Sequence, residues 1–137
     1  MRTSTHPHRF PMLLLATMAL APVAQAATPL ELLADYSKLA GSPPLPERGQ
    51  RLFTTEGKSE LNLSCASCHG SVPTKAGKHA LSEKAIPPLA PAFNPESFTE
   101  KSKADRWFRL NCMEVLGRDC NAAEKADVLS WLLSFQR

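Results

Sequence analysis

The sequence lacks the features that mark repeat proteins and β-sheet proteins. It shows no internal repeat and no alternation of apolar and polar residues of the kind that half-buried β-strands produce. One long apolar run occurs near the N-terminus, and no second run follows it. At 137 residues the chain fits a single domain. These observations predict an all-α domain with long loops.

The apolar run has the layout of a signal peptide. Arg2 and Arg9 form a positively charged start, and residues 11–23 are apolar apart from one threonine. The tripeptide that ends at Ala26 matches an A-x-A cleavage site. The run is short for a membrane span. We therefore expect residues 1–26 to be a removed signal peptide and the mature protein to be exported to the periplasm.

The charge balance is close to neutral once this segment is set aside. Two of the 16 Lys and Arg residues lie in it, so 14 basic residues remain against 13 acidic residues, a net charge of +1. Such a balance provides no basic footprint for nucleic acid. All four cysteines lie in the remaining 111 residues, where an oxidising compartment disfavours unpaired thiols.

Helical signals recur along the mature chain. Thr28 and Glu31 form a capping box, and Asn121 and Glu124 form a second capping pair. Five prolines between residues 70 and 98 exclude a long helix there and leave room for at most one short turn. We therefore expect four helical segments, at residues 29–40, 47–53 and 100–114 and in the chain after Asn121.

The most informative stretch is Cys65-Ala66-Ser67-Cys68-His69, which places two thiols and an imidazole within five residues. A redox-active thiol pair of the thioredoxin type would follow a strand in a βαβ unit, which the sequence lacks. A zinc site could add Cys112 and Cys120 as ligands. The seven residues between them are unusual for zinc, however, and exported proteins rarely rely on four reduced thiolates.

Covalent c-type haem fits this stretch best. Cys65 and Cys68 would form the two thioether bonds, and His69 would be held against the iron as its proximal ligand. Attachment of this kind takes place outside the cytoplasm, which agrees with export. A buried macrocycle would also give a small, loop-rich chain a large apolar surface to pack around. The predicted cofactor is one covalently attached haem c.

Two flanking segments resemble class I cytochromes c. In that family an N-terminal helix with a Gly-x-x-x-aromatic pattern crosses a C-terminal helix that carries a packed aromatic residue. Gly49 and Phe53 match the first helix, and Trp131 matches the second. The resemblance implies a class I cytochrome c-like fold of four to five helices around one haem. It assigns residues 46–137 to the cytochrome c domain, preceded by a helix and linker at residues 27–45.

The second axial ligand of the iron is less obvious. Met113 is the one methionine after residue 26, and the one other histidine is His79, which lies in a lysine-rich loop and is predicted to be a surface residue. With about 100° per residue and Trp107 at zero, Asn111 falls at about 40° on the apolar face of its helix. Met113 falls at about 240°, on the charged side. A buried Asn needs a partner, which would be either the iron or a backbone carbonyl.

Cys112 directly follows Asn111, and in an oxidising compartment we expect it to form a disulfide with Cys120. The segment from Arg106 to Ser134 resembles the SHP-type (sphaeroides haem protein) monohaem cytochromes c. Those proteins share an Asn-Cys pair, a second Cys shortly after it and a similar C-terminal helix. Residues 86–99 resemble the same family.

The resemblance implies that Asn111 is the distal iron ligand and that the disulfide joins Cys112 and Cys120. In the family the Asn leaves on reduction, small diatomics such as O2 or NO bind, and a dihaem cytochrome c donates electrons. An amide is a hard ligand, which suits ferric iron better than ferrous iron. The predicted function is therefore periplasmic electron transfer with diatomic binding, and no catalytic residue is assigned. A conventional carrier using Met113 and a thiol-disulfide oxidoreductase using the Cys65–Cys68 pair are the alternatives.

Overall fold

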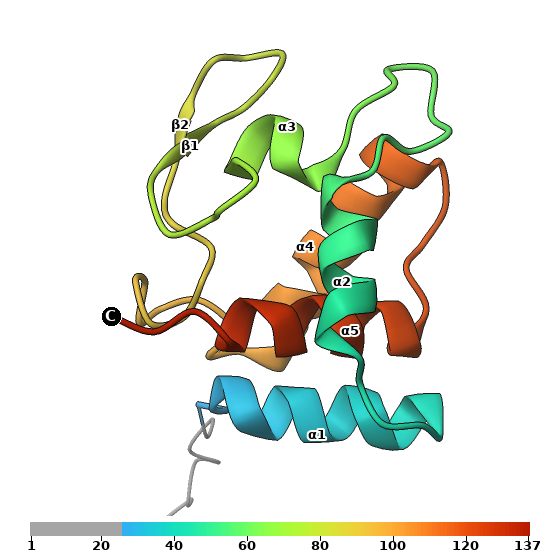
Figure 1. The fold of residues 1–137 in the computed structure, drawn as a ribbon, viewed down its shortest axis with the longest axis vertical. Helices are drawn as coiled ribbons and strands as arrows, with labels where there is room; N and C mark the ends of the chain where they lie inside the picture. The colour runs from blue at the N-terminus through green and yellow to red at the C-terminus, as the bar shows by residue number, and fades with distance from the viewer. Residues whose placement is uncertain (1–25) are drawn as a thin grey trace, which may run out of the picture.

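The computed structural model describes residues 26–137, so the predicted signal peptide lies outside the described residues except for Ala26 (Figure 1). The described chain forms five helices and one two-stranded antiparallel sheet. Their bounds are α1 Pro29–Ala40, α2 Pro46–Thr54, α3 Cys65–His69, β1 Gly77–Lys78, β2 Ala85–Ile86, α4 Lys101–Leu116 and α5 Ala122–Leu133. None of these helices combines the length and apolar character needed to cross a membrane. The mostly helical prediction is confirmed.

The helix ends follow from local capping chemistry. The Thr28 hydroxyl accepts from the Glu31 N–H, and the Glu31 carboxylate accepts from the Thr28 N–H, so both predicted partners are present at the start of α1. The Asn121 side chain caps α5 in the same reciprocal way with Glu124. Gly41 ends α1 with a φ of 66°, which a residue without Cβ adopts at little cost.

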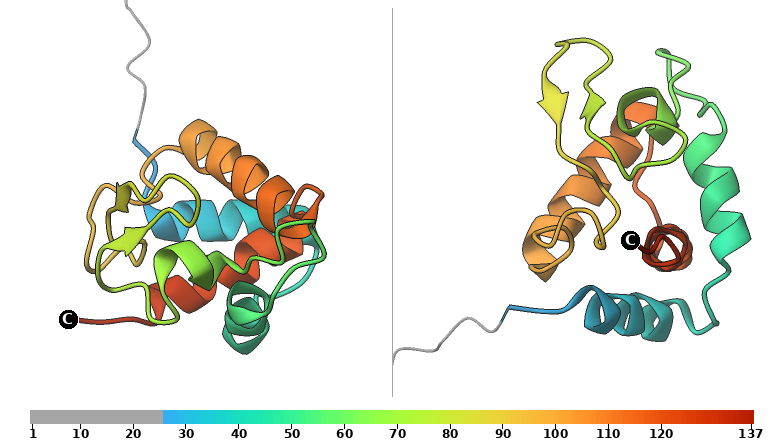
Figure 2. Two further views of the ribbon diagram at one scale, coloured as in Figure 1. Left: turned by 90° about the horizontal axis from the view of Figure 1, so that it is seen from above. Right: turned by 60° about the vertical axis from the view of Figure 1, so that its left-hand side comes forward.

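Helices α2 and α5 cross where the sequence predicted a close approach. A Cβ at Gly49 would overlap the backbone carbonyl of Asp127, so only glycine allows this separation. One turn later, the Phe53 ring packs against Trp131 with a centroid distance of 4.9 Å. Figure 2 shows α5 end-on with α1, α2 and α4 around it. Helix α5 is therefore the centre of the fold.

Helix α1 closes one side of the core by packing against α5 and α4, below α5 in the right-hand view of Figure 2. Leu32 and Tyr36 are fully buried against Leu129 of α5 and Ala104 of α4. The Tyr36 hydroxyl donates to Asp105 at 3.0 Å. Burial and this carboxylate neighbour raise the pKa of Tyr36, which keeps the hydroxyl available as a donor. Helix α1 thus packs into the same core as the helices that follow it.

A buried carboxylate joins the start of α2 to α5. Asp127 is 1% exposed. It accepts from the backbone N–H of Leu45 at 2.7 Å and from both Nε and Nη2 of Arg48. A charge at this depth needs such partners, because an unpaired buried carboxylate would be strongly unfavourable. This network holds the register of the α2–α5 crossing, and nothing in the local sequence pattern revealed it.

The segment predicted to be a loop with at most one short turn contains the β1–β2 hairpin. Gly77 pairs with Ile86, and Lys78 pairs with Ala85. Each strand has two residues, too few to show an alternating pattern in the sequence. A Cβ at Gly77 would overlap the carbonyl of Cys68, so the hairpin lies directly against α3.

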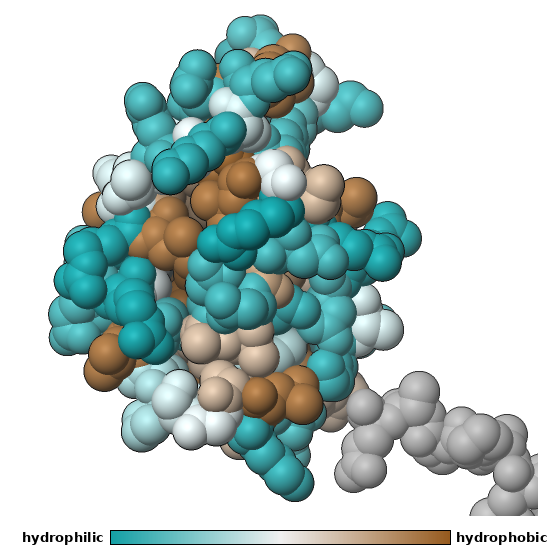
Figure 3. All heavy atoms as spheres, turned by 90° about the vertical axis from the view of Figure 1, so that its right-hand side faces the viewer, coloured by the Kyte–Doolittle hydropathy of each residue, from teal (hydrophilic) through white to brown (hydrophobic). Residues whose placement is uncertain are grey.

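Burial of apolar surface is incomplete. Trp107 and Leu110 of α4 are each about half exposed. Figure 3 shows apolar residues reaching the surface between hydrophilic ones on one face of the molecule. A domain of this size buries a smaller fraction of its apolar surface than a larger domain does.

Candidate cofactor site

A mostly apolar cavity lies between α3, α4, α2 and the hairpin. Most of its wall is aliphatic or aromatic, with polar side chains at a few points. The apolar residues are Leu52, Phe53, Leu63, Ile86, Leu89, Phe98, Ala104, Trp107, Phe108, Val115, Leu116 and Val128. A wall of this composition suits a large planar apolar group.

The Cys-x-x-Cys-His stretch forms the short helix α3 at one side of the cavity. Ser64 and Ser67 form a reciprocal capping box, which starts the helix at Cys65. Cys65, Cys68 and His69 all line the cavity, and both thiols are free. The three residues predicted to hold haem therefore face one common space.

His69 is held in an apolar setting. Its ring centroid lies 6.1 Å from that of Phe53, and its Nδ1 is buried without a hydrogen-bond partner among residues 26–137. Burial lowers the pKa of His69, which keeps the imidazole in the neutral form that binds metals. Nδ1 is therefore a buried polar atom for which the described residues supply no partner.

The same geometry argues against a redox-active thiol pair. Burial raises the pKa of the Cys65 thiol to about 11. A thiol that attacks disulfides instead needs a lowered pKa, so that a thiolate is present near neutral pH. Zinc is also disfavoured, because no group of three or more His, Cys, Asp or Glu side chains within residues 26–137 is arranged to hold a metal ion.

Helix α4 supplies the wall that carries Asn111. Asn111 is half-buried and lines the cavity, together with Ala104 and Phe108 from the same face. Met113 is 50% exposed and is not part of the cavity wall. The helical periodicity therefore predicted the orientation of both side chains: the carboxamide faces the cavity and the thioether faces outward.

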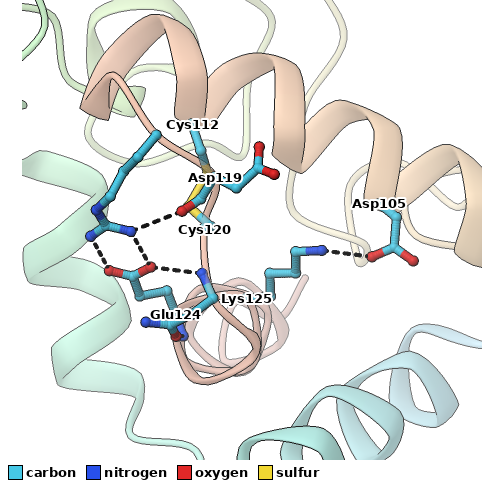
Figure 4. The surroundings of a disulfide bond; sticks show 8 residues. Asp105, Cys112, Asp119, Cys120, Glu124 and Lys125 are labelled. Atoms are coloured by element: carbon cyan, nitrogen blue, oxygen red, sulfur yellow. Dashed lines mark hydrogen bonds and ion pairs between the residues drawn. A yellow bond between two sulfur atoms is a disulfide. The ribbon is translucent and has the colours of Figure 1, made fainter.

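A disulfide joins Cys112 in the last part of α4 to Cys120 just before α5. Figure 4 shows this bond beside an ion pair in which Arg118 donates to Glu124 at 2.6 and 2.8 Å. Arg118 also donates to the carbonyl of Asp119 at 2.9 Å. The turn after α4 is thus closed by a covalent bond and a salt bridge, which fixes the backbone next to Asn111.

His79 differs from its prediction as a surface residue. It lies in the hairpin and lines the cavity, with its side chain 35% exposed. The lysine-rich neighbourhood of His79 suggested solvent exposure, because no local pattern indicates that the hairpin folds back over α3.

Comparisons with known proteins agree on one family. A family model described as a domain of unknown function (DUF1924) matches residues 40–132. The cytochrome c-type protein SHP of Cereibacter sphaeroides is 41% identical over 123 residues, which cover 88% of this chain and 95% of that protein. This chain belongs to the SHP-type cytochrome c family.

Solved structures of the SHP family and its relatives have the same fold. Oxidised SHP matches with a TM-score of 0.74 at 41% identity, over 80% of this chain and 99% of the SHP chain. The crystal structure of oxidised cytochrome c'' from Methylophilus methylotrophus matches with a TM-score of 0.73 at 32% identity, over 80% of this chain and 95% of that one.

Membership of the SHP family implies covalently attached haem c, and the residues present fit that group. Two free thiols lie three residues apart on α3, beside a partly buried imidazole whose pKa is lowered by burial. All three of these side chains line the apolar cavity described above.

Proposed function

We propose that this protein is a periplasmic monohaem cytochrome c that transfers electrons and binds small diatomics such as O2 or NO when reduced. Cys65 and Cys68 would hold one haem, His69 would be its proximal ligand and Asn111 its distal ligand. The observation that carries the proposal is the orientation of α4, which places Asn111 in the cavity wall and leaves Met113 outside it.

Haem iron supplies a one-electron couple and an axial position for a diatomic. Asn111 would offer its carboxamide oxygen, a hard donor that favours the ferric state. The side chain would release more easily on reduction than a thioether, which favours the ferrous state. The apolar wall of Phe98, Phe108 and Val115 would keep water out of the space that Asn111 leaves.

Descriptions of the relatives support this proposal. The structure of oxidised SHP is described as that of an oxygen-binding cytochrome c. A solution structure of cytochrome c'' is described as giving insight into haem-ligand detachment. By family resemblance, a dihaem cytochrome c is the proposed electron donor.

The test replaces the proposed ligand and compares it with its neighbour. Asn111→Ala should keep covalent haem but convert ferric iron from low spin to high spin, because the carboxamide is gone. Met113→Leu is the matched control on the same helix and should leave the absorption and paramagnetic resonance spectra nearly unchanged. An unchanged low-spin ferric spectrum in Asn111→Ala would exclude Asn111 as ligand, and loss of low-spin iron in Met113→Leu would restore the conventional carrier.

A further inference from the structure

Two ionisable side chains on the cavity wall have no role in the function proposed above. His79 reaches the cavity from the hairpin, and Glu114 reaches it from α4. Their side chains are 35% and 30% exposed, and His79 Nε2 lies 3.7 Å from a Glu114 carboxylate oxygen. Glu114 follows Asn111 by three residues, so both lie on the same face of the helix. The pair is therefore on the wall that carries the proposed distal ligand.

The hydrogen bonds of His79 assign its tautomer. Nδ1 accepts from the backbone N–H groups of Leu81 at 3.3 Å and Ser82 at 3.2 Å. A nitrogen that accepts two bonds carries no proton, so the proton of the neutral ring is on Nε2, facing Glu114. An Nε2–H donates hydrogen bonds, and it binds iron only after losing its proton. His79 is thus arranged as a donor and not as an axial ligand.

The backbone around His79 is fixed to the haem-attachment turn. The N–H of Ala80 donates to the Cys68 sulfur at 3.2 Å. The His79 N–H donates to the Lys84 carbonyl at 2.9 Å, which closes the hairpin, and Gly77 packs against the Cys68 carbonyl. The imidazole is consequently held by rigid contacts from two sides, unlike an ordinary side chain on a surface loop.

We propose that His79, oriented by Glu114, is the hydrogen-bond donor that favours O2 over carbon monoxide at the position that Asn111 vacates. The inference rests on the proposed function, because it needs a diatomic in this cavity. Donors near the iron decide how well a ligand that draws negative charge is held. Bound O2 draws such charge strongly and carbon monoxide draws it weakly, so an N–H donor on the cavity wall discriminates between them. Glu114, which lines the same cavity, would hold the imidazole with its Nε2–H on this wall.

The experiment measures dissociation of O2 and of carbon monoxide from the reduced holoprotein, together with the C–O stretching frequency of the carbon monoxide complex. His79→Leu should release O2 about tenfold faster, the effect of losing one hydrogen bond, and carbon monoxide within about twofold of the parent rate. The C–O frequency should rise as the donor is lost. His79→Gln restores an N–H donor and should recover most of both effects. Glu114→Gln should change both readouts in the same direction as His79→Leu, but by a smaller amount.

A matched control separates this role from hairpin stability. Lys78→Ala removes the solvent-facing Lys78–Glu83 ion pair of the same hairpin and should leave both readouts unchanged. Equal O2 release and an unmoved C–O band in His79→Leu would overturn the inference while leaving the proposed function intact. Failure of His79→Gln to recover either readout would also overturn it, since the effect would then be structural. A reduced parent protein that binds neither gas would overturn the proposed function and the inference with it.

Discussion

The α2–α5 crossing and the cavity side of the molecule are built differently. At the crossing, Leu129 and Leu132 of α5 are fully buried and are not part of the cavity wall. On the cavity side, none of the five residues of α3 is fully buried, and the apolar side chains around it face a space that the protein leaves unfilled. The difference indicates that protein packing alone completes one half of the fold, whereas the other half needs the haem to complete it.

This comparison explains how a small domain with long loops attains a stable fold. A group that binds only the folded state stabilises it, and a covalently attached group does not dissociate. Packing at the α2–α5 crossing holds these helices together without the cofactor. The cavity side depends on the cofactor. The following predictions probe this division, beginning with the largest expected effect.

Removing the attachment sites should affect the cavity side most. In Cys65→Ala/Cys68→Ala, loss of covalent haem should lower the free energy of unfolding by on the order of 4 kcal/mol or more. Haem staining and chemical denaturation measure the two effects. Amide exchange should remain slow at residues 49–53 and 128–132 while it rises around residues 65–86. Uniform loss of protection would contradict the division into two halves.

Gly49→Ala should damage the crossing and spare the site. The added Cβ overlaps the Asp127 carbonyl, and neither backbone can yield freely, so we expect a loss of about 3 kcal/mol. Gln50→Ala is the matched control on the exposed face of α2 and should stay within about 0.5 kcal/mol. Denaturant titration measures both variants, whose haem spectra should match the parent. A neutral Gly49→Ala would mean that the helices lie farther apart than described.

The disulfide lies between the two halves and should have an intermediate effect. Cys112→Ser/Cys120→Ser opens a short loop and should cost about 2–3 kcal/mol in the chain-entropy model. Because Cys112 adjoins Asn111, part of the ferric iron should also become high spin. Chemical denaturation and ferric absorption spectra test these two expectations. A stability loss without any spectral change would show that the bond fixes the helix ends but not the ligand.

Lowering the pH should weaken the contact between α1 and α4, with a smaller effect on stability than the substitutions above. Partial burial acts to raise the pKa of Asp105, but hydrogen bonds from Lys101, Lys125 and Tyr36 outweigh it and hold the pKa at about 2, below the ordinary 3.8. This stabilisation is therefore complete above the ordinary pKa and is lost as pH falls toward 2. In Asp105→Asn the unfolding free energy should depend less on pH in that window. An identical pH dependence in both proteins would exclude this role of Asp105.

Local signals in the sequence predicted the helix ends and the orientation of Asn111. The capping boxes at Thr28 and Asn121 depend on neighbours three residues away, and the 3.6-residue period separates Asn111 from Met113. Cys65, Cys68 and His69 were identifiable for the same reason, since their chemistry lies within one turn.

Contacts between distant segments could not be predicted in this way. His79 and Glu114 are 35 positions apart, and their meeting depends on a hairpin whose strands are too short to show a pattern. Asp127 and Arg48 are 79 positions apart. The helices that α1 contacts could not be predicted either, because an amphipathic pattern shows which face of a helix is apolar but not which helix it will contact.

Two contacts hold α4 where it lines the cavity. Asp105 joins it to α1 and α5 through hydrogen bonds, and Cys112 joins it to the segment before α5 through the disulfide. Asp105 and Cys112 are seven positions apart, close to two full turns of the helix. Inserting or deleting a single residue between them would rotate the carboxamide of Asn111 by about 100° unless one anchor were given up. The number of residues between Asp105 and Cys112 is therefore fixed by the two contacts that hold α4.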